Sequence, residues 1–190
     1  IMKSKLINSA VIMLVVLTTV AFTNSKKEVN TSESTIKWTG EKVTGSHEGT
    51  IQLESGYLLM EDDKITGGEF VMDMSTITVT DLSGDSKEKL EGHLKSDDFF
   101  GTSDHPKAKL VITSAASKGN GKYGIVGDLT IKEQTHPLTF DLTMNGDTAT
   151  TQVTIDRTKY DVRYGSGSFF DNLGDKTIYD NFDLDITLKF

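Results

Sequence analysis

Apolar and polar side chains alternate with a period of two through most of the chain from residue 35 onward. In the last such segment, aspartate, threonine and lysine separate the apolar residues Phe182, Leu184, Ile186, Leu188 and Phe190. Successive side chains of a β-strand point to opposite faces, so this alternation predicts strands with one apolar face and one solvent-facing face. The chain is therefore expected to be an all-β protein.

Turns and one helix interrupt the predicted strands. Short segments rich in glycine and asparagine separate the alternating runs, and the sequence Gly-Asn-Gly at 119–121 predicts a hairpin. The alternation stops between residues 81 and 100. There the four-residue spacing of Leu90 and Leu94 predicts one short helix, over about residues 86–96, outside the sheet.

About eight antiparallel strands with one apolar face are compatible with either a β-sandwich or a closed β-barrel. A closed barrel removes the unpaired strand edges that a large sheet exposes, and a barrel of about eight strands can hold a small ligand inside. The alternation predicts an apolar interior in both cases and does not choose between them.

The first segment has the pattern of an export signal. Two lysines within the first five residues precede an apolar run over residues 10–17, and small and polar residues follow. The run is short for a membrane-spanning helix, which needs about 20 apolar residues. We expect a cleaved signal peptide over residues 1–24, a disordered linker over 25–33 and a folded domain over 34–190, in a periplasmic or secreted protein. An uncleaved anchor is the alternative.

Composition excludes several classes of protein. The chain has no cysteine, which rules out disulfides, thiolate metal sites and cysteine nucleophiles. It carries 20 basic and 28 acidic residues, a net charge of −8. A nucleic-acid-binding protein needs a basic stripe to displace counterions, and the sequence contains none, so nucleic acid is not an expected partner.

The sequence offers little for catalysis. No Gly-x-Ser-x-Gly elbow is present, and no two histidines are three to five residues apart, as a local zinc pair would require. We therefore predict no catalytic residues, no metal site and no cofactor. His47, between Gly45 and Gly49, is a candidate for a hydrogen bond to a ligand's polar group; the alternative is an ordinary loop histidine.

The long apolar side chains allow two interpretations. They either fill the interior, as is normal in proteins, or some of them line an apolar cavity. Phe169-Phe170, with Gly165-Ser166-Gly167 before them, predict a mobile apolar loop beside an opening.

Arg157 continues the inward parity of the strand before it, so its charge is expected to be buried. A buried charge costs several kcal/mol unless it is paired, which predicts a carboxylate partner. Asp73 and Asp156 are the candidates. The alternative role for Arg157 is a polar anchor for a ligand.

Seven segments, taken in order, resemble the YceI-like family of exported proteins over about residues 31–190. These segments are STIKWTG at 34–40, GSHEG at 45–49, GGEFVMDM at 67–74, LEGHLKSDDFF at 90–100, GDLTIK at 127–132, THPLTF at 135–140 and DRTKY at 156–160. Two positions depart from the family pattern: Glu133 stands where glycine is usual, and His105 precedes Pro106 where an aromatic residue is common.

The resemblance implies an extended, lipocalin-like antiparallel β-barrel with an apolar tunnel for a polyisoprenoid chain, such as the tail of an isoprenoid quinone. It implies no catalytic centre. The predicted ligand-binding residues are Trp38, Phe70, Met72, Phe99, Phe140, Leu142, Phe169 and Phe170, with His47, Asp73 and Arg157 at the polar end. An isoprenoid lipid or similar amphiphile is the expected partner; transient membrane contact and a homodimer stay open.

Three functional hypotheses remain at this point. The first is an exported lipid-binding protein that serves transport, storage or sequestration. The second is an enzyme that acts on a lipid or small redox molecule in the same cavity. The third is a β protein with a filled core that acts through its acidic surface.

Overall fold

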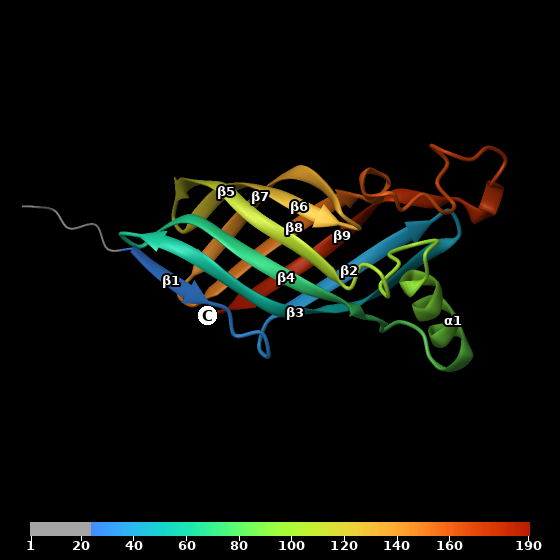
Figure 1. The fold of residues 1–190 in the computed structure, drawn as a ribbon, viewed down its shortest axis with the longest axis horizontal. Coiled ribbons are helices and arrows are strands. Elements are labelled where there is room, and N and C mark those ends of the chain that lie inside the picture. The colour runs from blue at the N-terminus through green and yellow to red at the C-terminus, as the bar shows by residue number, and fades with distance from the viewer. Residues whose placement is uncertain (1–23) are drawn as a thin grey trace, which may run out of the picture.

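The alternating segments form nine strands, eight of which close into an antiparallel barrel with one helix at its end (Figure 1). The computed structural model describes residues 24–190. The elements are β1 (Asn24–Glu28), β2 (Thr35–Lys42), β3 (Gly45–Glu61), β4 (Lys64–Val79), α1 (Gly84–Lys95), β5 (Lys107–Gly119), β6 (Lys122–Ile131), β7 (Gln134–Asn145), β8 (Thr148–Asp156), the short 3-10 helices η1 (Arg157–Tyr160) and η2 (Gly174–Lys176), and β9 (Ile178–Lys189).

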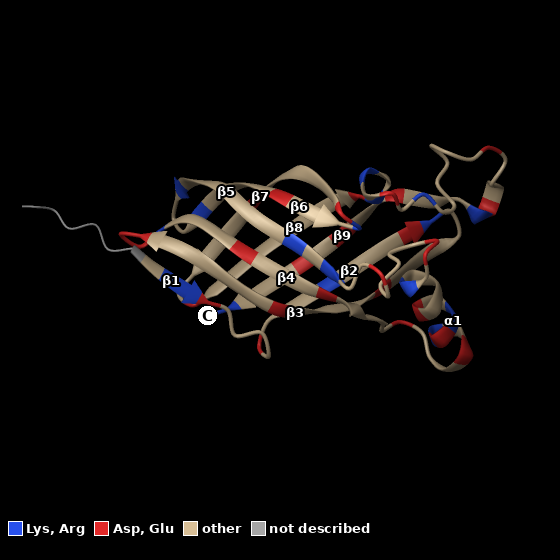
Figure 2. Cartoon of the chain, viewed as in Figure 1, with Lys and Arg blue, Asp and Glu red and all other residues tan. Residues whose placement is uncertain are grey.

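The ring runs in the order β3-β2-β9-β8-β7-β6-β5-β4, and β4 pairs with β3 to close it. Every pairing in the ring is antiparallel. The barrel that the family resemblance implies is therefore confirmed, and the sandwich alternative is excluded. Acidic and basic residues are interspersed along the strands and on α1 (Figure 2).

The segment predicted to be a disordered linker, residues 25–33, is ordered, and that prediction is wrong. Strand β1 pairs with residues 57–61 of β3, and the N–H of Asn30 donates to the carbonyl of Lys189 at 2.7 Å. The reason is a mismatch of length: β3 has 17 residues and β2 has 8, so β2 leaves part of the β3 edge uncovered, and β1 covers it. The predicted signal peptide lies, apart from residue 24, outside the described residues.

The predicted helix is confirmed with slightly different bounds, as α1. It is held to the end of β4 by the Glu91 carboxylate, which accepts a hydrogen bond from the N–H of Val79 at 2.8 Å. This hydrogen bond lowers the pKa of Glu91. Leu94 is the buried residue of the helix. Within residues 24–190, no helix combines the length and the apolarity that a membrane span requires.

Two of the hairpins turn on residues in the left-handed region. The predicted hairpin at 119–121 is confirmed, with φ of 52° at Asn120 and 72° at Gly121. The turn between β6 and β7 consists of Lys132 and Glu133, with φ of 47° and 63°. A side chain with a Cβ is strained in this region, and Glu133 is the position where the family usually has glycine.

Replacing Glu133 with glycine is expected to stabilise the barrel. Glycine relieves the left-handed strain but increases the entropy of the unfolded chain. The net gain in the free energy of unfolding is about 1 kcal/mol, which corresponds to a rise of roughly 2–4 °C in Tm. Thermal unfolding followed by circular dichroism measures it. Lys132→Gly is the matched variant and should show no gain, because the Lys132 ammonium donates to the carbonyl of Phe99 at 2.9 Å. An unchanged or lower Tm for Glu133→Gly would contradict the strain argument.

Candidate binding cavity

The interior of the barrel contains a cavity of about 180 Å³ with an almost entirely apolar wall. All eight strands of the ring contribute side chains to it, as do α1 and the segment that follows the helix. The apolar core forms two clusters of buried residues. Six partly buried residues pack against both clusters and line the cavity between them: Ile51, Met72, Leu110, Phe140, Leu184 and Ile186. The hollow therefore occupies the middle of the barrel and is not plugged by its own side chains.

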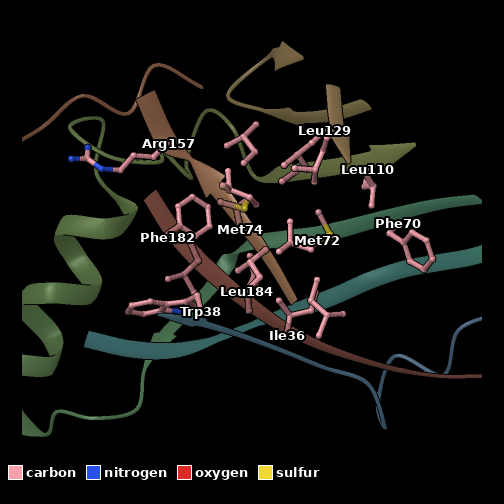
Figure 3. Close-up of a pocket in the computed structure, with 18 of the residues that line it drawn as sticks. Ile36, Trp38, Phe70, Met72, Met74, Leu110, Leu129, Arg157, Phe182 and Leu184 are labelled. Atoms are coloured by element: carbon pink, nitrogen blue, oxygen red, sulfur yellow. The ribbon is translucent and has the colours of Figure 1, made fainter. Parts of the chain in front are cut away.

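The cavity is suited to a hydrocarbon because its wall offers water almost no hydrogen-bonding partner. Figure 3 shows Met72, Leu110 and Leu184 projecting into it from three different strands. A cavity of this size that is lined by aliphatic and aromatic groups stays dry and accepts apolar guests. The third sequence hypothesis, a filled core, is therefore not supported by the structure.

The cavity reaches the surface where β2 and β9 lose their regular register. Gly40 pairs with Phe182 and Lys42 pairs with Ile178, so residues 179–181 face Glu41 alone. Such a bulge bends the strand and interrupts the ladder. Outside the adjacent residues, no heavy atom of the described chain lies within 4 Å of the place where a Cβ on Gly40 would stand, so the space beside it is free. Exposed residues line the cavity at this point: Glu41, Tyr179 and Asn181.

A second, more polar hollow adjoins this opening. It is lined by Thr39, Glu41, Thr154, Tyr179, Asp180, Asn181 and Asp183. Glu41, Tyr179 and Asn181 line both hollows. The apolar cavity thus has a polar rim on one side, the arrangement that an amphiphile with an apolar tail and a polar end would need.

Arg157 lines the same cavity (Figure 3). The centroid of the Phe99 ring lies 5.6 Å from its guanidinium carbon. Its side chain is 3% exposed and donates to three backbone carbonyls: Nε to Tyr179 at 3.0 Å, Nη1 to Val162 at 2.8 Å and Nη2 to Ile178 at 3.0 Å. Burial lowers the pKa of Arg157, and the nearby carboxylate of Asp180 opposes the shift.

The inward direction predicted for Arg157 is confirmed, and the predicted carboxylate partners are wrong. The carboxylate in ion-pair contact is Asp180, 3.7 Å from Nη2. Asp156 instead accepts from the N–H and hydroxyl of Thr158 and caps η1. Because the three carbonyls satisfy most of the guanidinium, the arginine acts mainly as a brace that joins η1 to the start of β9.

Asp73 and His47 do not reach the cavity, and their predicted place at its polar end is wrong. Asp73 accepts from the N–H and hydroxyl of Ser75, and its neighbour Met72 takes the inward direction. His47 Nδ1 lies 2.8 Å from Oδ2 of Asp81, which links the β3 end to the segment after β4. Burial raises the pKa of Asp81, but its hydrogen bonds with His47 and the Glu48 N–H outweigh that effect, and the pKa is lowered overall.

Phe169 and Phe170 also lie outside the cavity wall. They belong to the segment between η1 and η2 that extends beyond the barrel (Figure 1), and they are 47% and 51% exposed. Phe169 stacks under Arg163, whose guanidinium carbon is 4.7 Å from the ring centroid. Their segment is joined to the cavity wall where the Gly165 carbonyl accepts a hydrogen bond from the N–H of Ile178, and their position beside an opening stays a prediction.

The other predicted residues do lie in the wall: Trp38, Phe70, Met72, Phe99, Phe140 and Leu142. That they bind a ligand stays a prediction. The sequence analysis did not predict the rim residues Glu41, Tyr179 and Asn181. The β2–β9 bulge brings them together, and no local sequence pattern indicates that bulge. Within residues 24–190, no group of three or more histidine, aspartate or glutamate side chains is placed to hold a metal ion.

Comparison with known proteins gives one family match. The family model described as a YceI-like domain matches residues 28–190. The UPF0312 protein of Shewanella denitrificans is 41% identical over 76 residues, 40% of this chain and 38% of that protein. A UPF0312 protein of Staphylococcus epidermidis is 42% identical over 73 residues, 38% of this chain and 40% of that protein. The matched stretch thus covers about two fifths of the length of these curated relatives.

Solved structures share the barrel. Burkholderia cenocepacia BcnA matches with a TM-score of 0.64 and 20% identity, over 84% of this chain and 98% of that chain. A polyisoprenoid binding domain from Saccharophagus degradans, implicated in plant cell wall breakdown, matches with a TM-score of 0.60 and 13% identity, over 85% of this chain and 95% of that one. At these identities the likeness establishes the fold alone.

Arg157→Lys is expected to destabilise the mouth of the cavity. A single ammonium cannot reproduce the planar fork that reaches three carbonyls, so the free energy of unfolding should fall by about 2 kcal/mol. Urea unfolding measures the loss, and hydrogen exchange should show faster exchange at Ile178.

Arg163→Lys is the matched control. Arg163 is 53% exposed on its side chain, so its replacement should change stability by less than about 0.5 kcal/mol. Equal effects of the two substitutions would contradict the bracing role of Arg157.

Proposed function

The chain belongs to the YceI-like family, and on that premise we propose that it binds a polyisoprenoid chain, such as the tail of an isoprenoid quinone, in the cavity of the barrel. The observation that carries the proposal is the apolar hollow inside the barrel, which shares Glu41, Tyr179 and Asn181 with a more polar hollow at the β2–β9 bulge. Binding would serve transport, storage or sequestration of the lipid in an aqueous compartment, with the periplasm or the extracellular medium as the expected location.

The affinity for such a ligand comes from burial of its hydrocarbon. Each CH₂ group moved from water into an apolar environment contributes about 0.8 kcal/mol. A few isoprene units therefore bind well without specific polar contacts.

Binding is favoured over catalysis by the chemistry of the wall. In the described part of the chain, the ionisable side chains that line the cavity are Glu41, Arg157 and Tyr179. The Arg157 guanidinium is engaged with backbone carbonyls, and Glu41 is exposed at the rim. No acid and base face each other across the bore, which general acid–base catalysis would require.

Ala108→Phe is expected to block ligand uptake. Ala108 is buried in the cavity wall on β5, and a phenyl group there would occupy the space of the hydrocarbon. Losing room for about two CH₂ groups lowers affinity roughly tenfold or more. The chain has one tryptophan, Trp38, which lines the cavity, so quenching of its fluorescence by a farnesyl-tailed benzoquinone measures binding.

Ala115→Phe is the matched control, because Ala115 lies on the same strand and is outside the cavity wall. It should change affinity by less than about twofold, a difference below 0.5 kcal/mol. Circular dichroism checks that both variants fold. Unchanged binding by a folded Ala108→Phe variant would contradict a ligand inside the barrel.

Contact with a lipid surface is a second part of the proposal. Four aromatic side chains near the opening, Tyr164, Phe169, Phe170 and Tyr179, are 46–51% exposed. Their segment is continuous with the rim through Ile178 and projects beyond the barrel (Figure 1). Aromatic side chains favour the boundary between water and lipid, and the proposed ligand comes from a membrane, so a bilayer surface is the partner that fits this patch.

Replacing both Phe169 and Phe170 with serine should slow transfer of the farnesyl-tailed quinone from phosphatidylcholine vesicles by roughly thirtyfold, since each lost aromatic contact is worth around 1 kcal/mol. Stopped-flow quenching of Trp38 measures the rate. Leu59→Ser is the control, because Leu59 is 43% exposed on β3 beside β1. Equal transfer rates in all three proteins would contradict the membrane contact.

A further inference from the structure

Trp38 carries a hydrogen-bond donor that the barrel itself does not satisfy. Its indole Nε1 is buried and has no hydrogen-bond partner. A buried donor without a partner costs about 1–3 kcal/mol, so such groups are rare unless something else satisfies them. The side chain lines the cavity between Phe182 and Leu184 of the facing strand and Gly49 on its other side (Figure 3).

The position of Trp38 is just inside the opening. It is two residues from Gly40, where the wall lacks a side chain and the register with β9 breaks. Its ring is held against the backbone of β3: a Cβ on Gly49 would lie 2.6 Å from Cζ2 of Trp38 and would overlap the Thr78 carbonyl. The indole is therefore a fixed feature of the mouth, at the boundary between the apolar bore and the polar rim.

The charges at this boundary are mostly negative. Among the residues that line the two hollows, Glu41, Asp180 and Asp183 are acidic and Arg157 is basic. Arg157 is occupied by three carbonyls and by Asp180. Asp183 accepts from the Thr154 hydroxyl at the rim. Asp180 accepts from the Ser168 hydroxyl through Oδ2, while its Oδ1 is buried without a hydrogen-bond partner among the described residues, 3.7 Å from Nη2 of Arg157. Like charges repel, so this rim disfavours an anionic group.

From these observations we propose that the β2–β9 bulge is a head-group site for an uncharged oxygen acceptor, such as a quinone carbonyl, which accepts the hydrogen bond of the Trp38 indole. The exposed amide of Asn181 supplies a second neutral donor at the rim. The site selects quinone-like or other neutral ends over prenyl phosphates and diphosphates. This inference rests on the proposed function, because it places the polar end of a ligand whose tail fills the bore.

The test compares three ligands that share a farnesyl tail: a farnesyl-tailed benzoquinone, the hydrocarbon farnesane and farnesyl diphosphate. Isothermal titration calorimetry measures their affinities for the full chain and for Trp38→Phe, which keeps an aromatic ring and removes the N–H. The quinone should bind more tightly than the hydrocarbon, and the diphosphate most weakly. The ratio of quinone to hydrocarbon affinity should fall about threefold to tenfold in Trp38→Phe, as expected for loss of one hydrogen bond.

A second variant tests the charge argument independently of the indole. Glu41→Gln with Asp183→Asn should raise the affinity for the diphosphate by a larger factor than the affinity for the quinone, and the gain should shrink at high salt. Both side chains keep their approximate shape in this variant, and calorimetric unfolding confirms that it folds.

The outcomes separate the two proposals. Failure of all three ligands to bind overturns the proposed function and this inference with it. Binding of farnesane and the quinone with the same ratio in the parent and in Trp38→Phe leaves the lipid cavity standing and overturns the head-group site. Tighter binding of the diphosphate than of the quinone overturns the selection for a neutral end.

Discussion

Pairing of β3 with β4 closes the ring, and the rest of the structure depends on that closure. Once every strand has a neighbour on both sides, the backbone N–H and C=O groups of the wall are satisfied within the wall itself. The interior then needs no water or polar side chains to be stable, and inward residues can be apolar along its length. A dry hollow can persist only where this condition holds, and the barrel meets it over most of the ring. The ladder is interrupted at the β2–β9 bulge, and β7 and β8 pair only through residues 143–145 and 148–150.

Much of the cavity wall could be predicted from parity alone. A residue two positions from an inward residue on a regular strand also points inward, which placed Trp38, Phe70, Met72, Phe140 and Leu142 correctly. Parity fails where the ladder is irregular. The bulge puts three residues of β9 opposite one residue of β2. The position of the rim residues therefore depends on how the two strands pair, which the local sequence pattern does not indicate.

The charged residues show a different limit of sequence reasoning. That Arg157 points inward follows from the parity of β8, the strand before it. Its partners are the carbonyl of Val162, just after η1, and those of Ile178 and Tyr179 at the start of β9, which are 21 and 22 residues away in sequence. The expected carboxylate exists, but it is Asp180 of β9 and not Asp73 or Asp156. The hydrogen bonds of the guanidinium go to backbone carbonyls, and no sequence pattern reveals where carbonyls converge. The ordered β1 was missed for a related reason: its polar residues carry no alternation, and the free edge of β3 decides its conformation.

The short β1 strand has a practical consequence for anyone who shortens this chain. It pairs with β3 along its whole length, and Lys27 Nζ also lies 2.8 Å from Oδ1 of Asp147 in the turn after β7. A truncation that removed residues 24–28 would expose unpaired backbone N–H and C=O groups of β3. A strand of another molecule could then pair with this edge. The five residues of β1 do not line the cavity, yet their loss is expected to make the protein aggregate.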